Sequence, residues 1–323
     1  MRILITGANG QLGRDFQKLF DREGIDYVAS DFITARSTQQ TASGEQPLHL
    51  DITDLKSIRK LVADIKPDVI INCAAYNAVD KAEIEWEKAY TINGIGVRNL
   101  AIVANELNAV LVHYSTDYVF DGSKKEPYTI FDLPNPLSRY GESKYLGEKL
   151  LVQTGGRFIL IRTSWVFGVG NINFAKKVLE WAQKNEELKI VIDEISVPTY
   201  TVDLAQATWI IINKRAYGLY HISNEGECSR YEYASYILEK IGWRGKLLPV
   251  KQKDFDLPAK RPKYSKLSNF GLKETVNIEM PDWKNAVDRF LEELGYSVWL
   301  MAYGKLRIAY SIWHLANSLH IGR

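Results

Sequence analysis

The first half of the chain alternates short apolar runs with longer segments in which apolar residues recur at helical spacing. Several of the runs are apolar on consecutive residues, which is typical of strands covered on both faces. The apolar runs are 3–6, 27–29, 48–50, 69–73, 110–113 and 158–161, and the helical segments between them include 11–20, 55–65, 85–107 and 143–152. This alternation predicts an α/β fold, a Rossmann-type doubly wound parallel sheet with right-handed crossovers.

The regular rhythm loosens after residue 167. Prolines and glycines interrupt the pattern, and we expect a smaller C-terminal α/β lobe that holds the variable part of a substrate. The helical segments predicted here are 173–184, 203–213, 230–241 and 282–294. The expected organisation is a first domain over 1–167, to which later segments can return, and a lobe over 168–295.

The last segment, 296–323, is unlike the rest of the chain. It is rich in Trp, Tyr, Leu and Ile, with Lys305, Arg307, His314 and His320 spread through it. Its apolar residues cover most of a helical circumference, which favours a helix packed on the domain or in a homodimer interface. A helix lying on a membrane surface is the alternative, and the role of this extension is left open.

Composition restricts the partners and the compartment. The chain of 323 residues carries 41 Lys and Arg against 39 Asp and Glu, and this near-neutrality argues against a broad nucleic-acid surface. The two cysteines, Cys73 and Cys228, have no nearby cysteine, so a disulfide framework or a zinc site is not expected. No apolar stretch is long enough for a transmembrane helix, and we expect a cytoplasmic protein, monomeric or homodimeric.

A glycine-rich turn lies between the first predicted strand and the first predicted helix. The segment 7–13 reads Gly-Ala-Asn-Gly-Gln-Leu-Gly, so Gly7, Gly10 and Gly13 are spaced G-x-x-G-x-x-G, with Asn9, Gln11 and Leu12 between them. Glycine allows the sharp turn and the close approach of backbone to a pyrophosphate, which the helix N-terminus then attracts. We therefore predict a dinucleotide cofactor, NADPH or NADH.

The choice between these two cofactors depends on Asp31, at the end of the second predicted strand. A carboxylate there accepts hydrogen bonds from ribose hydroxyls and repels a 2′-phosphate, which favours NAD. Arg14 and Arg36 favour NADP instead, because either one can pair with that phosphate. Asp51 and Ile52, after the third predicted strand, are expected to bracket the adenine.

Tyr140 and Lys144 form a Tyr-x-x-x-Lys pair. On a helix these residues share one face, so the phenol and the ammonium can reach one ligand, and the ammonium is expected to lower the phenol pKa. Thr116 ends the fifth predicted strand, at the edge of a parallel sheet where ligands bind. Two hydroxyls that converge on one carbonyl oxygen are what a ketone reductase requires.

These motifs resemble the extended short-chain dehydrogenase/reductase family. The similarity spans about residues 1–295, and it is narrowest with the branch that reduces the C4 ketone of dTDP-4-dehydro-L-rhamnose. The segments that carry it are the glycine turn, Asn72-Cys73-Ala74-Ala75, Ser115-Thr116-Asp117-Tyr118-Val119-Phe120, the Tyr140/Lys144 pair, Arg162-Thr163-Ser164-Trp165-Val166-Phe167, Arg261-Pro262 and Pro281-Asp282-Trp283.

The resemblance implies roles for individual residues. Tyr140 would protonate the C4 oxygen, Lys144 would orient the cofactor and Thr116 would share the oxyanion. Asp117, Tyr118 and Trp165 would line the sugar pocket, and Ala74, Ala75 and Asn93 would lie along the cofactor. Arg261 is a candidate partner for the substrate diphosphate, with a surface or interdomain ion pair as the alternative.

Some members of the family dimerise through a magnesium ion bound by acidic residues. Asp15 and Glu293 fall at matching positions, but the third position is Val202. This departure makes a bound Mg²⁺ doubtful.

Two other functions stay open at this point. One is a reductase or epimerase for another nucleotide sugar, because the fold supports many such reactions. The other is a non-catalytic regulatory subunit like that of methionine adenosyltransferase, which shares the fold. The presence of Tyr140, Lys144 and Thr116 together favours an enzyme.

Overall fold

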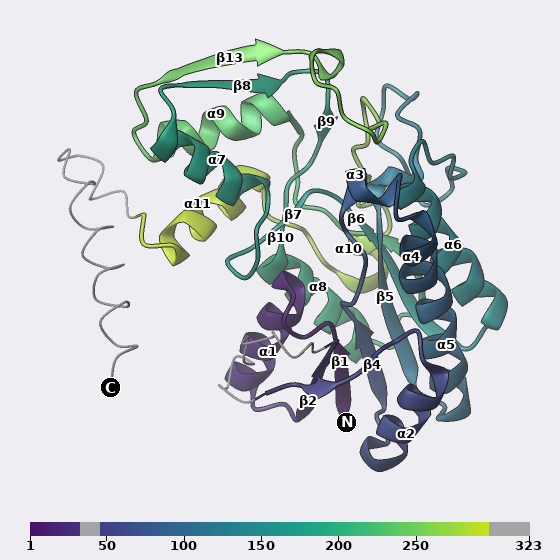
Figure 1. Ribbon diagram of the computed structural model, residues 1–323. Coiled ribbons are helices and arrows are strands. Elements are labelled where there is room, and N and C mark those ends of the chain that lie inside the picture. The colour runs from purple at the N-terminus through teal and green to yellow at the C-terminus, as the bar shows by residue number, and fades with distance from the viewer. Residues whose placement is uncertain (33–45, 297–323) are drawn as a thin grey trace, which may run out of the picture.

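The computed structural model describes residues 1–32 and 46–296. A seven-stranded sheet with the order β11-β6-β5-β4-β1-β2-β3 forms its centre (Figure 1), and every neighbouring pair in it is parallel. The strands are β1 (Ile3–Thr6), β2 (Tyr27–Asp31), β3 (Leu48–His49), β4 (Val69–Asn72), β5 (Val110–Thr116), β6 (Arg157–Thr163) and β11 (Gly218–His221). The predicted doubly wound parallel sheet is therefore confirmed.

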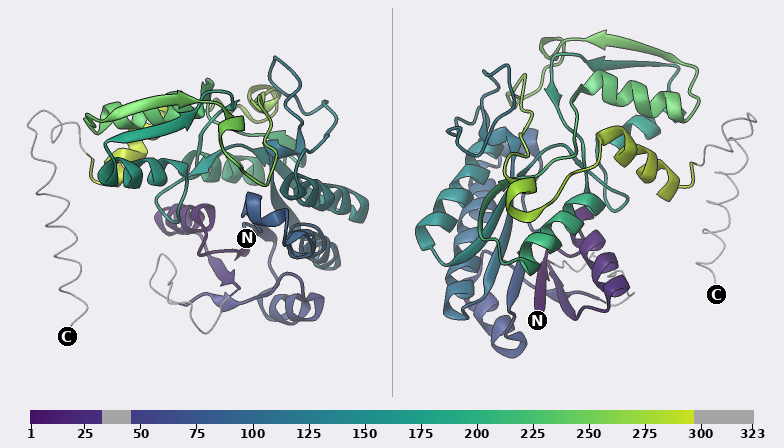
Figure 2. Two further views of the ribbon diagram at one scale, coloured as in Figure 1. Left: turned by 45° about the horizontal axis from the view of Figure 1, so that its top comes forward. Right: turned by 180° about the vertical axis from the view of Figure 1, so that it is seen from behind.

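Helices cover both faces of this sheet, each with its own apolar core (Figure 2). On one face, Phe16 and Phe20 pack against Leu204 and Ile211; on the other, side chains such as Ile58 and Leu100 pack against Ile70. The helices of the first face are α1 (Gln11–Glu23), α8 (Thr201–Asn213) and α10 (Leu272–Val276), and those of the second are α2 (Leu55–Ile65), α5 (Val97–Glu106) and α6 (Arg139–Thr154). The chain thus returns to the first core after residue 167, through α8, β11 and α10.

The helical segment predicted over 85–107 is a continuous helix that is interrupted near its centre by a π-helical turn. It consists of α4 (Trp86–Tyr90), the π-helical turn η1 (Thr91–Gly96) and α5, and the short α3 (Val79–Ala82) precedes it. Asn93 and Gly94 lie in the π-helical turn, against the middle of α6. A π-helical turn inside an α-helix often marks a functional site.

A smaller lobe packs beside the main sheet. Its core gathers Phe167, Tyr233, Trp283 and Phe290. The elements are β7 (Val166–Phe167), α7 (Phe174–Lys184), β8 (Glu187–Val191), β9 (Ile195–Ser196), β10 (Thr199–Tyr200), β12 (Cys228–Ser229), α9 (Arg230–Lys240), β13 (Lys246–Val250) and α11 (Trp283–Glu293), with the 3₁₀ turns η2 (Asp117–Val119) and η3 (Gln252–Asp254) elsewhere in the fold. The short strands pair in twos, β10 with β7, β12 with β9 and β13 with β8.

The predicted helix starts at 11, 55 and 230 are confirmed, whereas those at 203 and 143 differ from the structure by two residues or more. Asp54 caps α2 by accepting a hydrogen bond from the Lys56 N–H. The helix predicted from 203 begins at Thr201, and Asp203 does not cap it, because its carboxylate is paired with Arg289 at 2.7 Å. Helix α6 begins at Arg139, ahead of the predicted start at 143, because Ser138 caps it by accepting from the Gly141 N–H.

Two sequence predictions lie outside the described residues: Arg36 as a partner for a 2′-phosphate, and the packing or membrane-surface helix over 297–323. Within the described residues, no helix is long and apolar enough to span a bilayer.

The contact between α6 and η1 gives a first prediction. A Cβ built at Gly147 would lie 2.1 Å from the Asn93 carbonyl oxygen, so alanine there must push α6 away from the π-helical turn. We expect Gly147→Ala to lower the free energy of unfolding by about 1–3 kcal/mol, the usual cost of overpacking, in denaturant titrations. Gln153→Ala, at an exposed position of the same helix, should leave it nearly unchanged; equal effects of both would contradict the close contact.

Candidate active site

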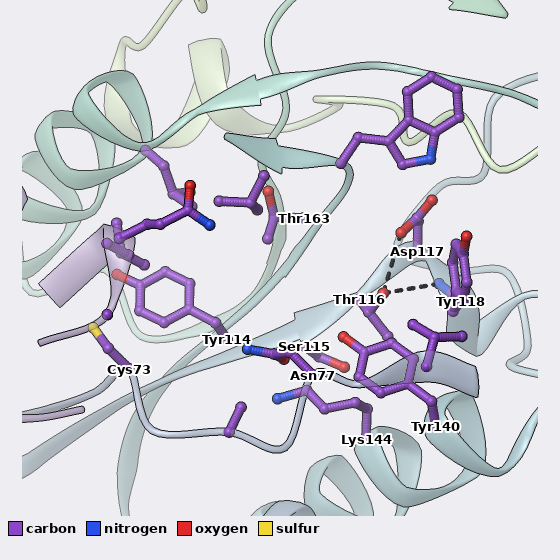
Figure 3. Close-up of a pocket in the computed structure, with 18 of the residues that line it drawn as sticks. Cys73, Asn77, Tyr114, Ser115, Thr116, Asp117, Tyr118, Tyr140, Lys144 and Thr163 are labelled. Carbon is purple, nitrogen blue, oxygen red and sulfur yellow. Dashed lines mark hydrogen bonds between the residues drawn. The ribbon is translucent and has the colours of Figure 1, made fainter. Parts of the chain in front are cut away.

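A cavity of 520 Å³ opens at the carboxyl ends of the parallel strands and extends beneath the smaller lobe (Figure 3). Residues of β4, β5 and β6 reach it, as do the N-terminus of α1 and one face of α6. The predicted site residues that line it are Gly10, Gln11, Leu12, Ala74, Ala75, Thr116, Asp117, Tyr118, Tyr140, Lys144 and Trp165. The fold therefore brings together the glycine turn, the Tyr-x-x-x-Lys pair and the two strings of residues expected around the sugar.

The glycine turn lies directly before α1, so that the helix begins at the cavity wall. Gly7 has a φ of +66°, and a Cβ on it would lie 2.4 Å from the Ala74 backbone nitrogen. A Cβ on Gly13 would lie 2.5 Å from the Gly7 carbonyl oxygen. Both glycines allow the turn to close against β4 and α1. The α1 N-terminus thereby faces the cavity through Gly10 and Gln11, as a pyrophosphate requires.

Asp31 and Asn9 hold the glycine turn from outside the cavity. The Asp31 carboxylate accepts hydrogen bonds from the backbone N–H groups of Asn9 and Phe32, both at 2.7 Å. The buried Asn9 Oδ1 has no hydrogen-bond partner among the described residues. Asp31 therefore connects the end of β2 to the turn, whichever cofactor binds.

Besides Asp31, Asn9 and the two glycines Gly7 and Gly13, three further residues expected at the cofactor do not line this cavity. Asp51 accepts hydrogen bonds from the backbone and side chain of Thr53, and Ile52 belongs to the core on the α2 and α5 face. Asn93 is buried, accepts from the Tyr76 N–H and donates to the Ser143 hydroxyl. Its amide thus fixes the segment beside α6, and the expectation that Asn93 lies along the cofactor stays a prediction.

Tyr140 and Lys144 lie one turn apart on α6 and point into the cavity (Figure 3). Burial raises the pKa of the Tyr140 phenol to about 12, against the lowering effect of a hydrogen bond with Thr116. The expectation that Lys144 lowers this pKa is not met, because burial is the larger effect. The phenol is therefore protonated at neutral pH, the state that a proton donor requires.

Lys144 is a buried cation that makes no hydrogen bond within the described part of the chain. Only 3% of the residue is exposed. Burial lowers the pKa of its ammonium to about 8, although the Glu148 carboxylate one turn further along α6 acts to raise it. A buried charge without partners is costly, and the cavity is where a ligand can supply acceptors. Hydroxyl groups of a cofactor ribose fit this position.

A buried hydrogen-bond chain lies behind the lysine. The Asn72 Oδ1 accepts from the Thr6 hydroxyl at 2.7 Å and from the Ala74 N–H, so its amide nitrogen donates to His113 Nδ1 at 3.0 Å. His113 then carries its proton on Nε2, which has no partner among the described residues. Burial and the nearby Lys144 hold the pKa of His113 well below its ordinary value, so the imidazole is neutral.

Asp117 collects three hydroxyl groups from separate segments. It accepts hydrogen bonds from Thr116 at 3.1 Å, from Ser196 at 3.2 Å and from Ser265 at 2.5 Å. Burial raises the pKa of this carboxyl to about 6 in spite of these bonds. The Thr116 hydroxyl thus donates its proton in a hydrogen bond to Asp117 and accepts a hydrogen bond from the Tyr118 N–H. It is therefore not a free hydrogen-bond donor in this structure.

Trp165 covers the cavity from the side of the smaller lobe. Its φ is +42°, a strained conformation for a large side chain. The Trp165 ring stacks on the Tyr233 ring, with 6.5 Å between the two ring centroids. The guanidinium carbon of Arg230 lies 3.6 Å from the centroid of the Trp165 ring. Both Trp165 and Arg230 line the cavity.

Arg261 does not line the cavity of Tyr140 and Lys144. It lines a second cavity of 740 Å³, and its guanidinium donates to Asp80 at 2.6 Å and to the Ala259 carbonyl oxygen at 2.9 Å. The structure thus shows Arg261 in an ion pair with Asp80, and its role as a partner of the substrate diphosphate stays a prediction.

Asp15 and Glu293 are close together, but a cation of the chain already lies between them. The Lys18 ammonium is 3.3 Å from Asp15 and 2.7 Å from Glu293, and Val202 contributes only carbon atoms to this place. Across residues 1–32 and 46–296, no group of three or more His, Cys, Asp or Glu side chains could hold a metal ion. The residues do not fit a bound Mg²⁺.

Several residues that line the cavity were not predicted from the sequence. Ser115 and Thr163 carry buried hydroxyls without partners among the described residues, and their positions at the ends of two parallel strands could have indicated them. Arg230 and the pair Asn171 and Ile172 come from the smaller lobe and from the loop after β7. No sequence spacing signals those, because they reach the cavity only through the packing of the lobe.

The chain matches the family model described as RmlD substrate binding domain over residues 1–296. It is 38% identical over 292 residues to the spore coat polysaccharide biosynthesis protein SpsK of Bacillus subtilis (strain 168), covering 90% of this chain and 97% of that protein.

Two solved structures are also similar. The dTDP-4-dehydrorhamnose reductase from Clostridium acetobutylicum superimposes with a TM-score of 0.84 at 40% identity, covering 91% of this chain and 100% of that one. The dTDP-4-dehydrorhamnose reductase from Bacillus anthracis, in complex with NADP, gives 0.83 at 38% identity, covering 90% and 99%.

The raised pKa of Asp117 gives a prediction for stability. Folding favours its protonated form, so its contribution to the free energy of unfolding is fully present below the unfolded pKa of 3.8 and is lost as pH rises through about 6. The stability of the wild type minus that of Asp117→Asn should therefore fall by about 2–3 kcal/mol between about pH 4 and pH 7, measured by denaturant titration.

Asp121→Asn is the matched control for this measurement. Hydrogen bonds led by those from Ser123 lower the pKa of Asp121 to about 2, so its stability difference should stay nearly flat over the same window. A flat difference for Asp117→Asn as well would mean that this carboxyl ionises at its ordinary pKa.

Proposed function

Because the chain belongs to the RmlD family, we propose that it is an NADH- or NADPH-dependent reductase that converts the C4 ketone of dTDP-4-dehydro-L-rhamnose to the alcohol of dTDP-L-rhamnose. The similar reductases of C. acetobutylicum and B. anthracis support this substrate. The observation that carries the proposal is the protonated Tyr140 phenol beside the buried, unpartnered Lys144 ammonium, in a cavity that also receives the glycine turn.

The residues present fit a nicotinamide dinucleotide. The pyrophosphate would lie against Gly10, Gln11 and Leu12 at the N-terminus of α1, and Ala74 and Ala75 would form the wall beside it. The Lys144 ammonium would donate to ribose hydroxyls, which also relieves its burial without partners. The cofactor supplies the hydride for the reduction.

Tyr140 supplies the proton in this mechanism. Its phenol keeps its proton in the free protein because burial raises the pKa to about 12. A negative charge that develops on the ketone oxygen takes this proton, and the charged Lys144 nearby then stabilises the phenolate that is left. Lys144 is 3% exposed and Tyr140 is half-buried, so water has little access to the lysine beside the proton transfer.

Thr116 and Asp117 position the acid and the sugar. Thr116 forms a hydrogen bond with Tyr140 and one with Asp117, so the carboxylate holds the hydroxyl in one orientation. The Thr116 hydroxyl can donate to the ketone oxygen only after its hydrogen bond to Asp117 is broken. Trp165 and Tyr118 give the sugar ring an apolar wall and a rim of polar atoms.

Replacing the proposed acid tests the mechanism. Tyr140→Phe should lower kcat for dTDP-4-dehydro-L-rhamnose by roughly 10²- to 10⁴-fold, the usual contribution of general acid catalysis, with little change in KM. The measurement is oxidation of NADH and of NADPH in parallel, which also shows the preferred cofactor. Tyr145→Phe, on the same helix but outside this cavity, should retain activity.

If Tyr140→Phe keeps most of its activity, the assignment of the acid is wrong. Cofactor binding by the wild type without turnover of this substrate would instead favour another nucleotide sugar or a regulatory subunit.

The lowered pKa of Lys144 predicts the pH dependence of the reaction. The ammonium loses its charge as pH rises through about 8, and with it the donor to the ribose and the partner of the phenolate. The value of kcat/KM, which reports the free enzyme, should therefore fall above about pH 8. In Lys144→Arg the side chain stays charged, so the residual activity should persist to higher pH; an unchanged midpoint would assign this titration to another group.

A further inference from the structure

We infer that Arg230 is the residue that binds the diphosphate of the nucleotide-sugar substrate. This inference rests on the proposed function for the identity of the ligand. Arg230 is the first residue of α9, in the smaller lobe, and it lines the same cavity as Tyr140 and Lys144.

Two aromatic rings, those of Trp165 and Phe174, contact the guanidinium of Arg230. Its central carbon lies 3.6 Å from the Trp165 ring centroid and 4.7 Å from that of Phe174. Both rings contact Tyr233, which is fully buried. Stacking on aromatic rings leaves the N–H groups at the edge of the plane available, and that edge is the part of arginine that matches phosphate oxygens.

One edge of the guanidinium is paired: Nε lies 3.6 Å from a carboxylate oxygen of Glu194, and 15% of the Arg230 side chain is exposed. No residue of the described part of the chain accepts a hydrogen bond from the two Nη groups at the opposite end of the fork. A largely buried guanidinium with open donors is costly unless a ligand occupies them.

Arg261 differs in this respect. Its guanidinium already donates to Asp80, far away in the sequence, and to the carbonyl oxygen of Ala259 in its own segment. A diphosphate would have to break both. The substrate therefore finds open donors at Arg230 and occupied ones at Arg261.

The chemistry of the sugar also places its phosphate near Arg230. In a pyranose, C1 lies across the ring from C4, and Tyr140 protonates the oxygen on C4. The phosphate on C1 is therefore one ring width away from the carbon that is reduced. The exposed Lys251, Lys253, Lys260 and Lys263 line the second cavity instead. The phosphate attached to C1 is therefore expected in the cavity of Tyr140 and Lys144, and these solvated lysines are not part of its site.

Titration calorimetry with thymidine diphosphate, in the presence of NADP⁺, tests this inference. Arg230→Gln should weaken its binding roughly 10- to 100-fold, the range for a lost pair of charge-assisted hydrogen bonds, and leave binding of thymidine and of the cofactor unchanged. Arg230→Lys, which keeps the charge without the planar edge, should fall between. In turnover, Arg230→Gln should raise KM more than it lowers kcat.

Two matched variants serve as controls. Arg261→Gln should lower the melting temperature, since it breaks the pair with Asp80, with little effect on thymidine diphosphate affinity. Lys260→Gln should have little effect on either quantity. A loss of affinity in Lys260→Gln or Arg261→Gln, with none in Arg230→Gln, would place the diphosphate in the second cavity and overturn the inference.

Other results separate this inference from the proposed function. Equal weakening of thymidine and thymidine diphosphate binding by Arg230→Gln would show a structural role and also overturn it. If the wild type binds thymidine diphosphate through Arg230 but does not reduce dTDP-4-dehydro-L-rhamnose, the inference stands and the proposed reaction fails.

Discussion

The constraint on which the site depends is the burial of polar groups at one edge of a parallel sheet. Strands that are covered on both faces have no water at their sides, so polar side chains gather where the strands end. Thr6, Asn72, His113 and Thr116 lie at or near such ends and bond to one another or to neighbouring loops. The groups that remain unpaired, above all the Lys144 ammonium, then define what a ligand has to supply.

The same constraint explains how the smaller lobe is held in register. Its contacts with the first domain are polar and buried: Ser196 and Ser265 donate to Asp117, and Arg289 pairs with Asp203. Each such bond is directional, and a displaced lobe would leave a buried carboxylate without donors. The position of Trp165 and Arg230 over the cavity thus depends on bonds to Asp117, which itself lines the cavity, and on the pair of Arg289 with Asp203.

The sequence predicts the first domain well because local signals and the sheet agree there. The apolar run at β1, the glycine turn and the Asp54 cap each specify local structure, and parallel topology then places the Tyr140 and Lys144 pair beside Thr116. Asp51 and Ile52 are expected at the cofactor from their place in the chain, and Asn93 from the resemblance; in the fold these side chains also make internal hydrogen bonds or core contacts, which the sequence did not indicate. A single sequence does not show which acceptor a side chain finds first.

Electrostatics at the site likewise depend on burial, which spacing does not reveal. From the sequence, an ammonium four residues from a phenol is expected to lower the phenol pKa; in the fold, both groups are desolvated and each pKa moves toward its neutral form. The raised pKa of Tyr140 suits the proposed reaction, which needs a phenol that still carries its proton. A phenol that holds its proton until charge develops beside it is an acid in the free protein, and a lysine with a pKa of about 8 is still mostly charged at neutral pH. Lys144 is buried without a hydrogen-bond acceptor among the described residues, and Arg230 is largely buried; the ribose hydroxyls and phosphate oxygens of the proposed ligands would supply acceptors to both cations.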